Sequence, residues 1–389
     1  MERRKFLQLT ATGTGGLLIL PNFLTAQNLF LGLDKNNDNI LIFIQLNGGN
    51  DGLNTFIPFE DPLYYENRPK IGISKNKIIH AINGMGFHPA LKDLATISQD
   101  GNLTIIQNVG YPNPNRSHFR SQEIWQTASD SNQYLDYGWL GRFLDIQCKD
   151  DNLASLNIDN IDNLALKANI SNGLTIKDFN KIKRYNATES ELKLSDNPQL
   201  DFVRKLQFAS LEGMEEINKA LQNAQRFNET YASNALSKNL EWMAKLIKGG
   251  LNSKIYYTSL SGFDTHNNQI QMHQKQLNIL NDAVFSFYTD MKQNNLLSRV
   301  TMVVFSEFGR RVKENGTGTD HGTAGPMMII GGNNNGKVIG TNPDLNHLDK
   351  SDLIFKNDFR SVYATLLKHK FNFDSNLINI HNEVLKGIF

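Results

Sequence analysis

The sequence predicts an α/β protein with a mostly parallel central sheet. Nearly continuous apolar runs with β-branched members, such as Ile40–Leu46 and Leu103–Val109, are typical of strands buried on both faces. Between residues 255 and 305 a strand pattern, a helix pattern and a second strand pattern alternate. That alternation is the signature of βαβ crossovers, which place consecutive strands parallel to one another.

The elements follow from these patterns in chain order. After the two runs above, Ser117 is placed as the N-cap of a helix that extends to Thr127. Residues 150–190 are polar and weakly periodic, which predicts short strands and loops. The remaining expected elements are a helical insert over about residues 199–248, strands Ile255–Leu260, Val300–Phe305 and Met327–Ile330, and helices His273–Asn294, Asp358–Leu367 and Leu377–Leu385.

The N-terminus is predicted to be an export signal over residues 1–26, followed by one domain over residues 27–389. Arg3-Arg4 stands directly before an apolar stretch, as in twin-arginine signals, and Leu24-Thr25-Ala26 is an acceptable cleavage site. The stretch Phe6–Leu20 is diluted by Thr and Gly and is shorter than a membrane span. We therefore expect a cleaved signal instead of a permanent anchor, and a periplasmic or secreted protein.

Composition excludes some functional classes. The formal net charge of +1 gives no reason to expect nucleic acid as a partner. Cys148 is the single cysteine, so no intramolecular disulfide can form. Its surroundings lack the Cys-x-Pro-x-Arg signature, which disfavours a formylglycine-dependent sulfatase. Nothing in the composition indicates an oligomeric state.

Acidic and histidine residues adjoin several predicted strands. Asp51 follows the first strand; Asp264 and His266 follow the strand that ends at Leu260. Ligands bind beyond the carboxyl ends of strands in open α/β sheets, so we expect these side chains to converge. Asp, Glu and His are ligands of hydrolytic zinc, manganese or iron sites. The same pattern places Glu307, Asp320 and His321 among the metal ligands.

Each of these residues also has a structural interpretation. Asp51 can cap a turn, and His266 can simply bond to a neighbouring carboxylate. Glu307 can pair with Arg310 or Arg311. Four acidic segments, which carry Asp51, Asp264, Glu307 and Asp320, all lie beside predicted strands. Their joint occurrence favours a metal-dependent hydrolase over these separate explanations.

The segment Arg116–Arg120 offers the best nucleophile, Ser117. A hydroxyl at a helix N-terminus is favoured as an alkoxide by the helix dipole, and Arg116 and Arg120 can grip an oxyanion. Alternatively, Ser117 only caps the helix and a metal-activated water attacks. His118 is a candidate ligand or a group that supports one.

With these motifs described, the chain resembles an exported bacterial family known as domain of unknown function 1501. The matching segments are Leu46–Gly52, Asn115–Phe119, Gly138–Arg142, Gly262–His266, Ser306–Arg310, Thr319–Gly322 and Asp358–Tyr363. That family resembles a branch of the alkaline phosphatase and sulfatase superfamily. The resemblance implies a three-layer α/β/α sandwich with two metals beside a Ser or Thr nucleophile.

In that resemblance Asp51 matches a ligand of the first metal and Ser117 the nucleophile. Asp264, His266 and His321 match ligands of the second metal, while Glu307 stands where relatives have an Asp-His pair. We therefore expect an exported hydrolase of phosphate- or sulfate-type esters, acting on small molecules or glycans. Its metal is expected to be zinc, with manganese or calcium as alternatives. The rival hypothesis is a non-catalytic surface binding or assembly protein that kept the fold.

Overall fold

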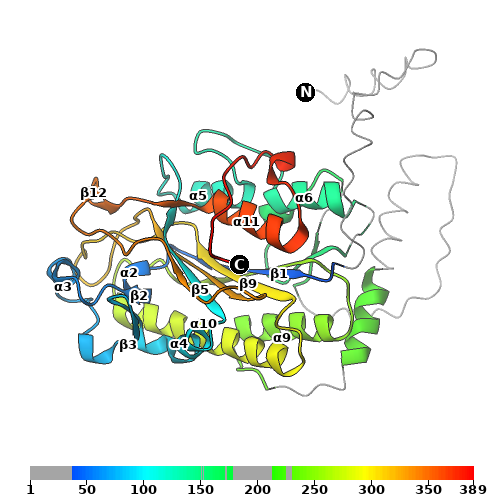
Figure 1. Ribbon diagram of the computed structural model, residues 1–389, viewed down its shortest axis with the longest axis horizontal. Helices are drawn as coiled ribbons and strands as arrows, with labels where there is room; N and C mark the ends of the chain where they lie inside the picture. The colour runs from blue at the N-terminus through cyan, green and yellow to red at the C-terminus, as the bar shows by residue number, and fades with distance from the viewer. Residues whose placement is uncertain (1–36, 150, 152, 171–172, 178–212, 225–229) are drawn as a thin grey trace, which may run out of the picture. The chain divides into compact units, whose positions relative to one another are not determined.

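A computed structural model describes residues 37–149, 151, 153–170, 173–177, 213–224 and 230–389 (Figure 1). The folded unit begins at Asp38, so the predicted export signal and its cleavage site lie outside the described residues. A central sheet of nine strands organises this unit. In spatial order the sheet contains β11 (Val338–Ile339), β5 (Leu103–Gly110), β10 (Gly325–Gly331), β9 (Val300–Ser306), β1 (Ile40–Asn47), β8 (Ile255–Ser261), β6 (Ser155–Asn157) and β7 (Leu174–Thr175), with β14 (Asn357–Asp358) paired to β5.

The strands of this sheet run parallel except for β10. Strand β1 pairs in parallel with β9 on one side and with β8 on the other. Strand β10 runs antiparallel to both β9 and β5. The predicted mostly parallel sheet is confirmed. The strands whose bounds were predicted correspond to β1, β5, β8, β9 and β10, and each prediction matches the observed bounds within two residues.

Helices cover both faces of the sheet, which gives three layers (Figure 1). On one face, Ile40, Ile42 and Ile44 of β1 pack in one apolar cluster with helices α4, α9 and α10. On the other face, Phe43 packs edge-on against Trp139 of α6 at 5.5 Å between ring centroids. The labelled helices within the described residues are α2 (Gly52–Thr55), α3 (Pro62–Asn67), α4 (Lys92–Gln99), α5 (His118–Thr127), α6 (Trp139–Gln147), α9 (Ala235–Lys248), α10 (Gln269–Gln293) and α11 (Phe359–Phe371).

The alternation along β1 explains this layering. Successive side chains of a strand point to opposite faces, and both faces of β1 carry large apolar groups. Stacked aromatic rings continue the second layer, with Trp125 of α5 on Phe305 and Trp139 on Tyr363 of α11. The three-layer α/β/α sandwich is therefore the observed architecture.

Two smaller sheets and several 3₁₀ turns accompany the central sheet. A second sheet consists of β2 (Phe56–Ile57), β4 (Met85–Phe87) and β3 (Ile79–Ile82), and the strands β12 (Leu348–Asp349) and β13 (Asp352–Leu353) form a hairpin. In the described part of the chain, the larger elements are connected by the 3₁₀ turns η2 (Lys75–Lys77), η3 (Pro89–Leu91), η4 (Leu164–Leu166) and η6 (Ser375–Ile378).

The predicted helix Leu377–Leu385 is wrong. Only the short turn η6 forms, and it ends at Asn379, whose φ of 60° is left-handed. Ile380 is buried on the far side of that break, and the backbone N–H of Leu385 donates to the Thr365 hydroxyl. The isolated apolar residues of this segment thus fill separate sites under an irregular chain, which spacing alone does not distinguish from a helix.

The predicted helical insert is described in part. Residues 213–223 are helical, and α9 packs on α10 and contributes side chains to the main core. Residues 199–212 and 225–229 of the prediction lie outside the described residues. Within the part of the chain that the structure describes, no helix is both long and apolar enough to cross a membrane.

Candidate metal centre

The acidic and histidine segments meet at one edge of the sheet because of strand order. Strands β9, β1 and β8 are neighbours and parallel, so the segments that follow them start at the same edge. Strand β10 is antiparallel, so the segment that precedes it, which carries Asp320 and His321, reaches that edge too. The loop after β5 brings Ser117 and His118 to the start of α5.

Gly48 permits the close approach of the first two of these segments. Its φ of +120° is a conformation that residues with a side chain rarely adopt. A Cβ at this position would lie 2.3 Å from the backbone nitrogen of Asp264. The loop after β1 can therefore contact the loop after β8 only with glycine at this position.

Three imidazoles surround the carboxylate of Asp264. Its Oδ1 lies 2.9 Å from Nε2 of His266 and 3.1 Å from Nε2 of His321. Its Oδ2 lies 3.4 Å from Nε2 of His118. One ligand atom each from His118, Asp264 and His321 lies within 4.8 Å of the others, a spacing that suits a single metal ion.

The outer nitrogen of each imidazole is held by an oxygen. Nδ1 of His118 lies 2.9 Å from Glu307 Oε1, and Nδ1 of His266 lies 3.2 Å from Asp320 Oδ1. Nδ1 of His321 lies 2.7 Å from the backbone carbonyl of Arg116. Carbonyls and carboxylates only accept, so each Nδ1 carries the proton.

When the rings are neutral, as metal ligands must be, their inner nitrogens therefore present lone pairs to one another. Nε2 of His266 and Nε2 of His321 are 3.1 Å apart, and neither has a proton to share in this tautomer. Nε2 of His118 is buried and makes no hydrogen bond within the described residues. A cation among these atoms would satisfy all of them, so the donor set fits a divalent metal such as zinc.

Glu307 holds the His118 ring in place through the hydrogen bond from its Nδ1. Its carboxylate is fully buried and also accepts a hydrogen bond of 2.9 Å from the backbone N–H of Gly48. The hydrogen bond to Glu307 raises the pKa of His118 above its usual value. In this position Glu307 orients a ligand through its Nδ1–H, as carboxylates beside metal-bound histidines do. Asp320 does the same for His266.

Asp264 also contacts a buried arginine. The guanidinium of Arg310 is fully buried and its Nη1 lies 3.0 Å from Asp264 Oδ1. Burial alone would raise the pKa of Asp264, but the hydrogen bond and the positive charge of Arg310 outweigh it and lower that pKa below its usual value. The carboxylate is thus held in the ionised form that metal binding requires.

The structure does not bring Asp51 into this cluster. Asp51 is fully buried, and its Oδ2 lies 2.7 Å from Nη1 of Arg68, which is equally buried. Gln269 donates a second hydrogen bond to the same oxygen. Burial tends to raise the pKa of Asp51, but the charge of Arg68 outweighs it and the pKa is lowered. These contacts are those of a structural ion pair.

Ser117 lies at the N-terminus of α5 beside the cluster. It is exposed, and its hydroxyl makes no capping hydrogen bond, so it is available to a bound molecule. The two neighbouring arginines are held elsewhere. Arg116 pairs with Asp352, and Arg120 bonds to Glu123 and to two backbone carbonyls.

A cavity of about 600 Å³ opens beside the cluster at Arg116. Its polar lining comes from the loop after β5 and from the β12–β13 hairpin, and its apolar lining includes Leu353 and Phe355. Arg116 connects the two features, since it lines the cavity and its backbone carbonyl contacts His321; no residue of the imidazole cluster itself lines the cavity.

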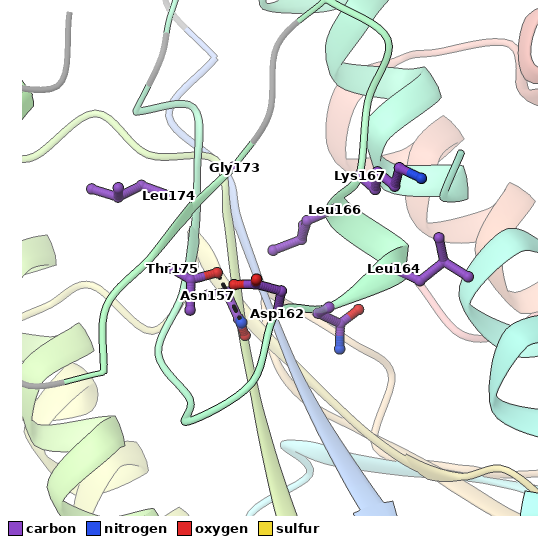
Figure 2. A pocket seen from close by; sticks show the side chains of 9 residues that line it. Asn157, Asp162, Leu164, Leu166, Lys167, Gly173, Leu174 and Thr175 are labelled. Carbon is purple, nitrogen blue, oxygen red and sulfur yellow. Dashed lines mark hydrogen bonds between the residues drawn. The ribbon is translucent and has the colours of Figure 1, made fainter. Parts of the chain in front are cut away.

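A second cavity, of about 610 Å³, lies where β6 and β7 end (Figure 2). Figure 2 shows Asn157 hydrogen bonded to Thr175, with Asp162 close to both. It is lined by none of the residues of the imidazole cluster.

Two features of the centre were not assigned from the sequence. His118 was named only as an alternative ligand, although Arg-Ser-His at the start of a helix places it beside the nucleophile candidate. Arg310 was considered only as a partner of Glu307, whereas its partner is Asp264. Which carboxylate Arg310 contacts depends on which loop packs above the end of the strand. The sequence carries no local signal for that packing.

A family model for "Protein of unknown function (DUF1501)" matches residues 107–370. The chain belongs to the DUF1501 family. The match includes Ser117, His118, Asp264, His266 and His321, so the whole cluster lies within the family's own region. No curated protein sequence matches the chain.

Solved structures similar to this DUF1501 protein include three bacterial proteins. The C-terminal periplasmic domain of EcEptC from Escherichia coli, in complex with Zn, is 12% identical over 77% of this chain and 74% of that one, with a TM-score of 0.36. A protein in the alkaline phosphatase superfamily from Vibrio parahaemolyticus is 11% identical over 86% and 66%, with a TM-score of 0.37. The phosphonate monoester hydrolase of Silicibacter pomeroyi is 8% identical over 90% and 76%, with a TM-score of 0.41. At TM-scores below 0.5, the activity has to be inferred from this chain's own residues.

Proposed function

We propose that this protein is a metal-dependent hydrolase of phosphate- or sulfate-type esters. The observation that carries the proposal is the convergence of three imidazole Nε2 atoms on Asp264, each with its Nδ1 held by an oxygen acceptor. Such preorganised lone pairs are characteristic of zinc ligands with their supporting groups. His118, Asp264, His266 and His321 would hold the metal, with zinc favoured by the nitrogen-rich donor set.

The bound metal would supply Lewis acidity that lowers the pKa of a hydroxyl and neutralises charge on the substrate oxygens. Ser117 would be the nucleophile: its exposed hydroxyl has no capping bond and lies at the positive end of α5. Backbone N–H groups at that helix N-terminus are suited to an anion, so they would orient the ester. Glu307 and Asp320 would keep His118 and His266 in the tautomer that binds metal.

The alcohol part of the ester would enter the cavity beside Arg116. Near its polar wall, Asp352 is buried between Arg116 and Arg311, which leaves one positive charge unbalanced in that group. The apolar wall formed by Leu353 and Phe355 suits a carbon skeleton. We therefore propose a small-molecule or glycan ester as the substrate.

The alternative function is a non-catalytic binding or assembly protein. The observation that favours it is that both arginines expected to grip an oxyanion are engaged, Arg116 by Asp352 and Arg120 by Glu123. Under that alternative the cluster would serve to recognise an anionic ligand or to stabilise the loops.

Export by the twin-arginine pathway, with a periplasmic or secreted destination, is also proposed. It is supported by Arg3-Arg4 before the apolar stretch and by the presence of a single cysteine. A protein that folds before export can take up its metal in the cytoplasm, which agrees with a centre assembled from loops distant in sequence.

A screen of phosphate, sulfate and phosphonate esters in the presence of zinc, manganese or calcium tests the proposal. We expect turnover of at least one ester class that disappears on chelation and in His321→Ala. Absence of turnover with every ester and metal, in protein that contains its metal, would support the binding alternative instead.

A further inference from the structure

Two arginines are buried among the carboxylates of this centre. Arg68 and Arg310 are 1% and 2% exposed, and they donate to Asp51 and Asp264, two of the three aspartates assigned to metals from the sequence. Buried arginine without a paired charge is costly, so each guanidinium is a fixed positive charge that its aspartate neutralises.

The two ion pairs belong to one network. Gln269 donates to Asp51 and accepts from the hydroxyl of Thr319 at 2.6 Å. That hydroxyl accepts from Nε of Arg310 at 3.2 Å, and Arg310 in turn donates to Asp264. Arg310 therefore contacts Asp264 directly and is linked to Asp51 through Thr319 and Gln269, so its positive charge lies in the network that joins the two aspartates.

The carboxylate of Glu307, another predicted ligand, is engaged in hydrogen bonds, whereas Oδ1 of the buried Asp51 has no partner among the described residues. Glu307 accepts from His118, from the backbone of Gly48 and from the hydroxyl of Ser306. The imidazole cluster around Asp264, in contrast, presents converging nitrogen atoms, and Nε2 of His118 makes no hydrogen bond within the described residues.

The sum of the charges around the cluster matches one divalent cation and not two. Asp264, Glu307 and Asp320 carry three negative charges around the cluster, and Arg310 contributes one positive charge. One divalent cation neutralises the two charges that remain, whereas a second would leave an excess of two positive charges. Asp51 and Arg68 cancel each other.

We propose that this centre holds one divalent cation, and that the guanidinium of Arg310 takes the place of a second one. The inference rests on the proposed metal-dependent function and departs from the two metals that the family resemblance implies. Arg310 is then a positioning residue, which fixes Asp264 and supplies a permanent positive charge that no chelator removes.

Native mass spectrometry and elemental analysis of the full-length mature protein, loaded with Zn²⁺ alone, test the proposal. We expect one equivalent in the wild type and one in the paired variant Asp51→Asn with Arg68→Gln, which removes both charges of the structural pair. Two equivalents in the wild type would overturn this inference and leave the hydrolase proposal standing. No bound zinc would instead refute the proposed metal-dependent function itself.

The charge of Arg310 is tested by comparing Arg310→Met with Arg310→Lys, because both lose the guanidinium's forked hydrogen bonds and only one keeps the charge. A single and a double charge about 6 Å apart repel each other, even at the dielectric constant of water, by enough to change affinity about tenfold. We expect the Met variant to bind Zn²⁺ at least about tenfold more tightly than the Lys variant by calorimetry. Equal affinities would overturn the assigned role of the charge, and circular dichroism of both variants verifies that they fold.

Discussion

Breaking the buried ion pair between Arg68 and Asp51 on one side only should strongly destabilise the fold. Arg68 is fully buried, and its guanidinium bonds to Asp51 at 2.7 Å, to Asn54 at 2.8 Å and to the carbonyls of Val312 and Arg311 at 2.9 and 2.8 Å. The change Arg68→Met keeps the apolar stem and leaves the Asp51 carboxylate buried without a counter-charge. Removal of one partner of such a pair costs about 3–5 kcal/mol of unfolding free energy.

Urea unfolding followed by circular dichroism measures this cost from the shift in midpoint. The control is Lys292→Met, which breaks an exposed pair with Asp100 of similar length, 2.9 Å. Both of its side chains are about half exposed, so its loss should cost less than about 1 kcal/mol. The two variants break ion pairs of nearly equal N–O distance, so the difference between their costs reports the effect of burial.

The double variant Arg68→Met with Asp51→Asn completes the cycle. It should cost less than the sum of the two single changes by about 0.5–3 kcal/mol, because neither charge is left alone. A cost for Arg68→Met no larger than that of Lys292→Met, or simple additivity in the double variant, would refute the structural role assigned to the pair.

Three further predictions concern separate groups. Burial lowers the pKa of His273 from 6.5 to about 4, so the unfolded chain binds a proton first and His273 removes roughly 3 kcal/mol of stability as the pH drops from about 6.5 to 4. His273→Gln should make the decline of the urea midpoint over this range less steep, with the neighbouring buried His88, whose pKa is also lowered, accounting for part of the rest. An equally steep decline in the variant would contradict this prediction. Glu307→Gln should weaken Zn²⁺ binding about 10–100-fold in calorimetry, since its carboxylate orients His118; an unchanged dissociation constant would show that it does not. Ser117→Ala should lower turnover on a confirmed ester by about a thousandfold or more with an unchanged melting temperature, whereas wild-type turnover would assign the attack to water.

The fold was predictable because its strands have nearly continuous apolar sequences. Ile40–Asn47 is buried along almost its whole length, and an apolar run of that kind between loops has few other interpretations. The end of the chain was not predictable in the same way, since Leu377, Ile378 and Ile380 suit a helix by spacing and occupy separate positions in the structure.

The site was predictable at the level of the sheet edge. The segment that follows β8 and the segment that precedes the antiparallel strand β10 reach the same edge of the sheet, which is why Asp264, His266 and His321 lie together. The position of Asp51 depended on Arg68, which lies directly after the short helix α3 and carries no sequence pattern that links it to the first strand. Pairing across loops is a tertiary property, and it decides which acid faces the cluster.

The central claim is most directly tested by anomalous diffraction from crystals grown with zinc and measured on both sides of the zinc absorption edge. We expect an anomalous peak at about 2.0–2.1 Å from Nε2 of His118, His266 and His321 and bonded to Asp264. A peak elsewhere on the chain, or no peak at full zinc loading, would contradict the assignment of this cluster as a metal centre.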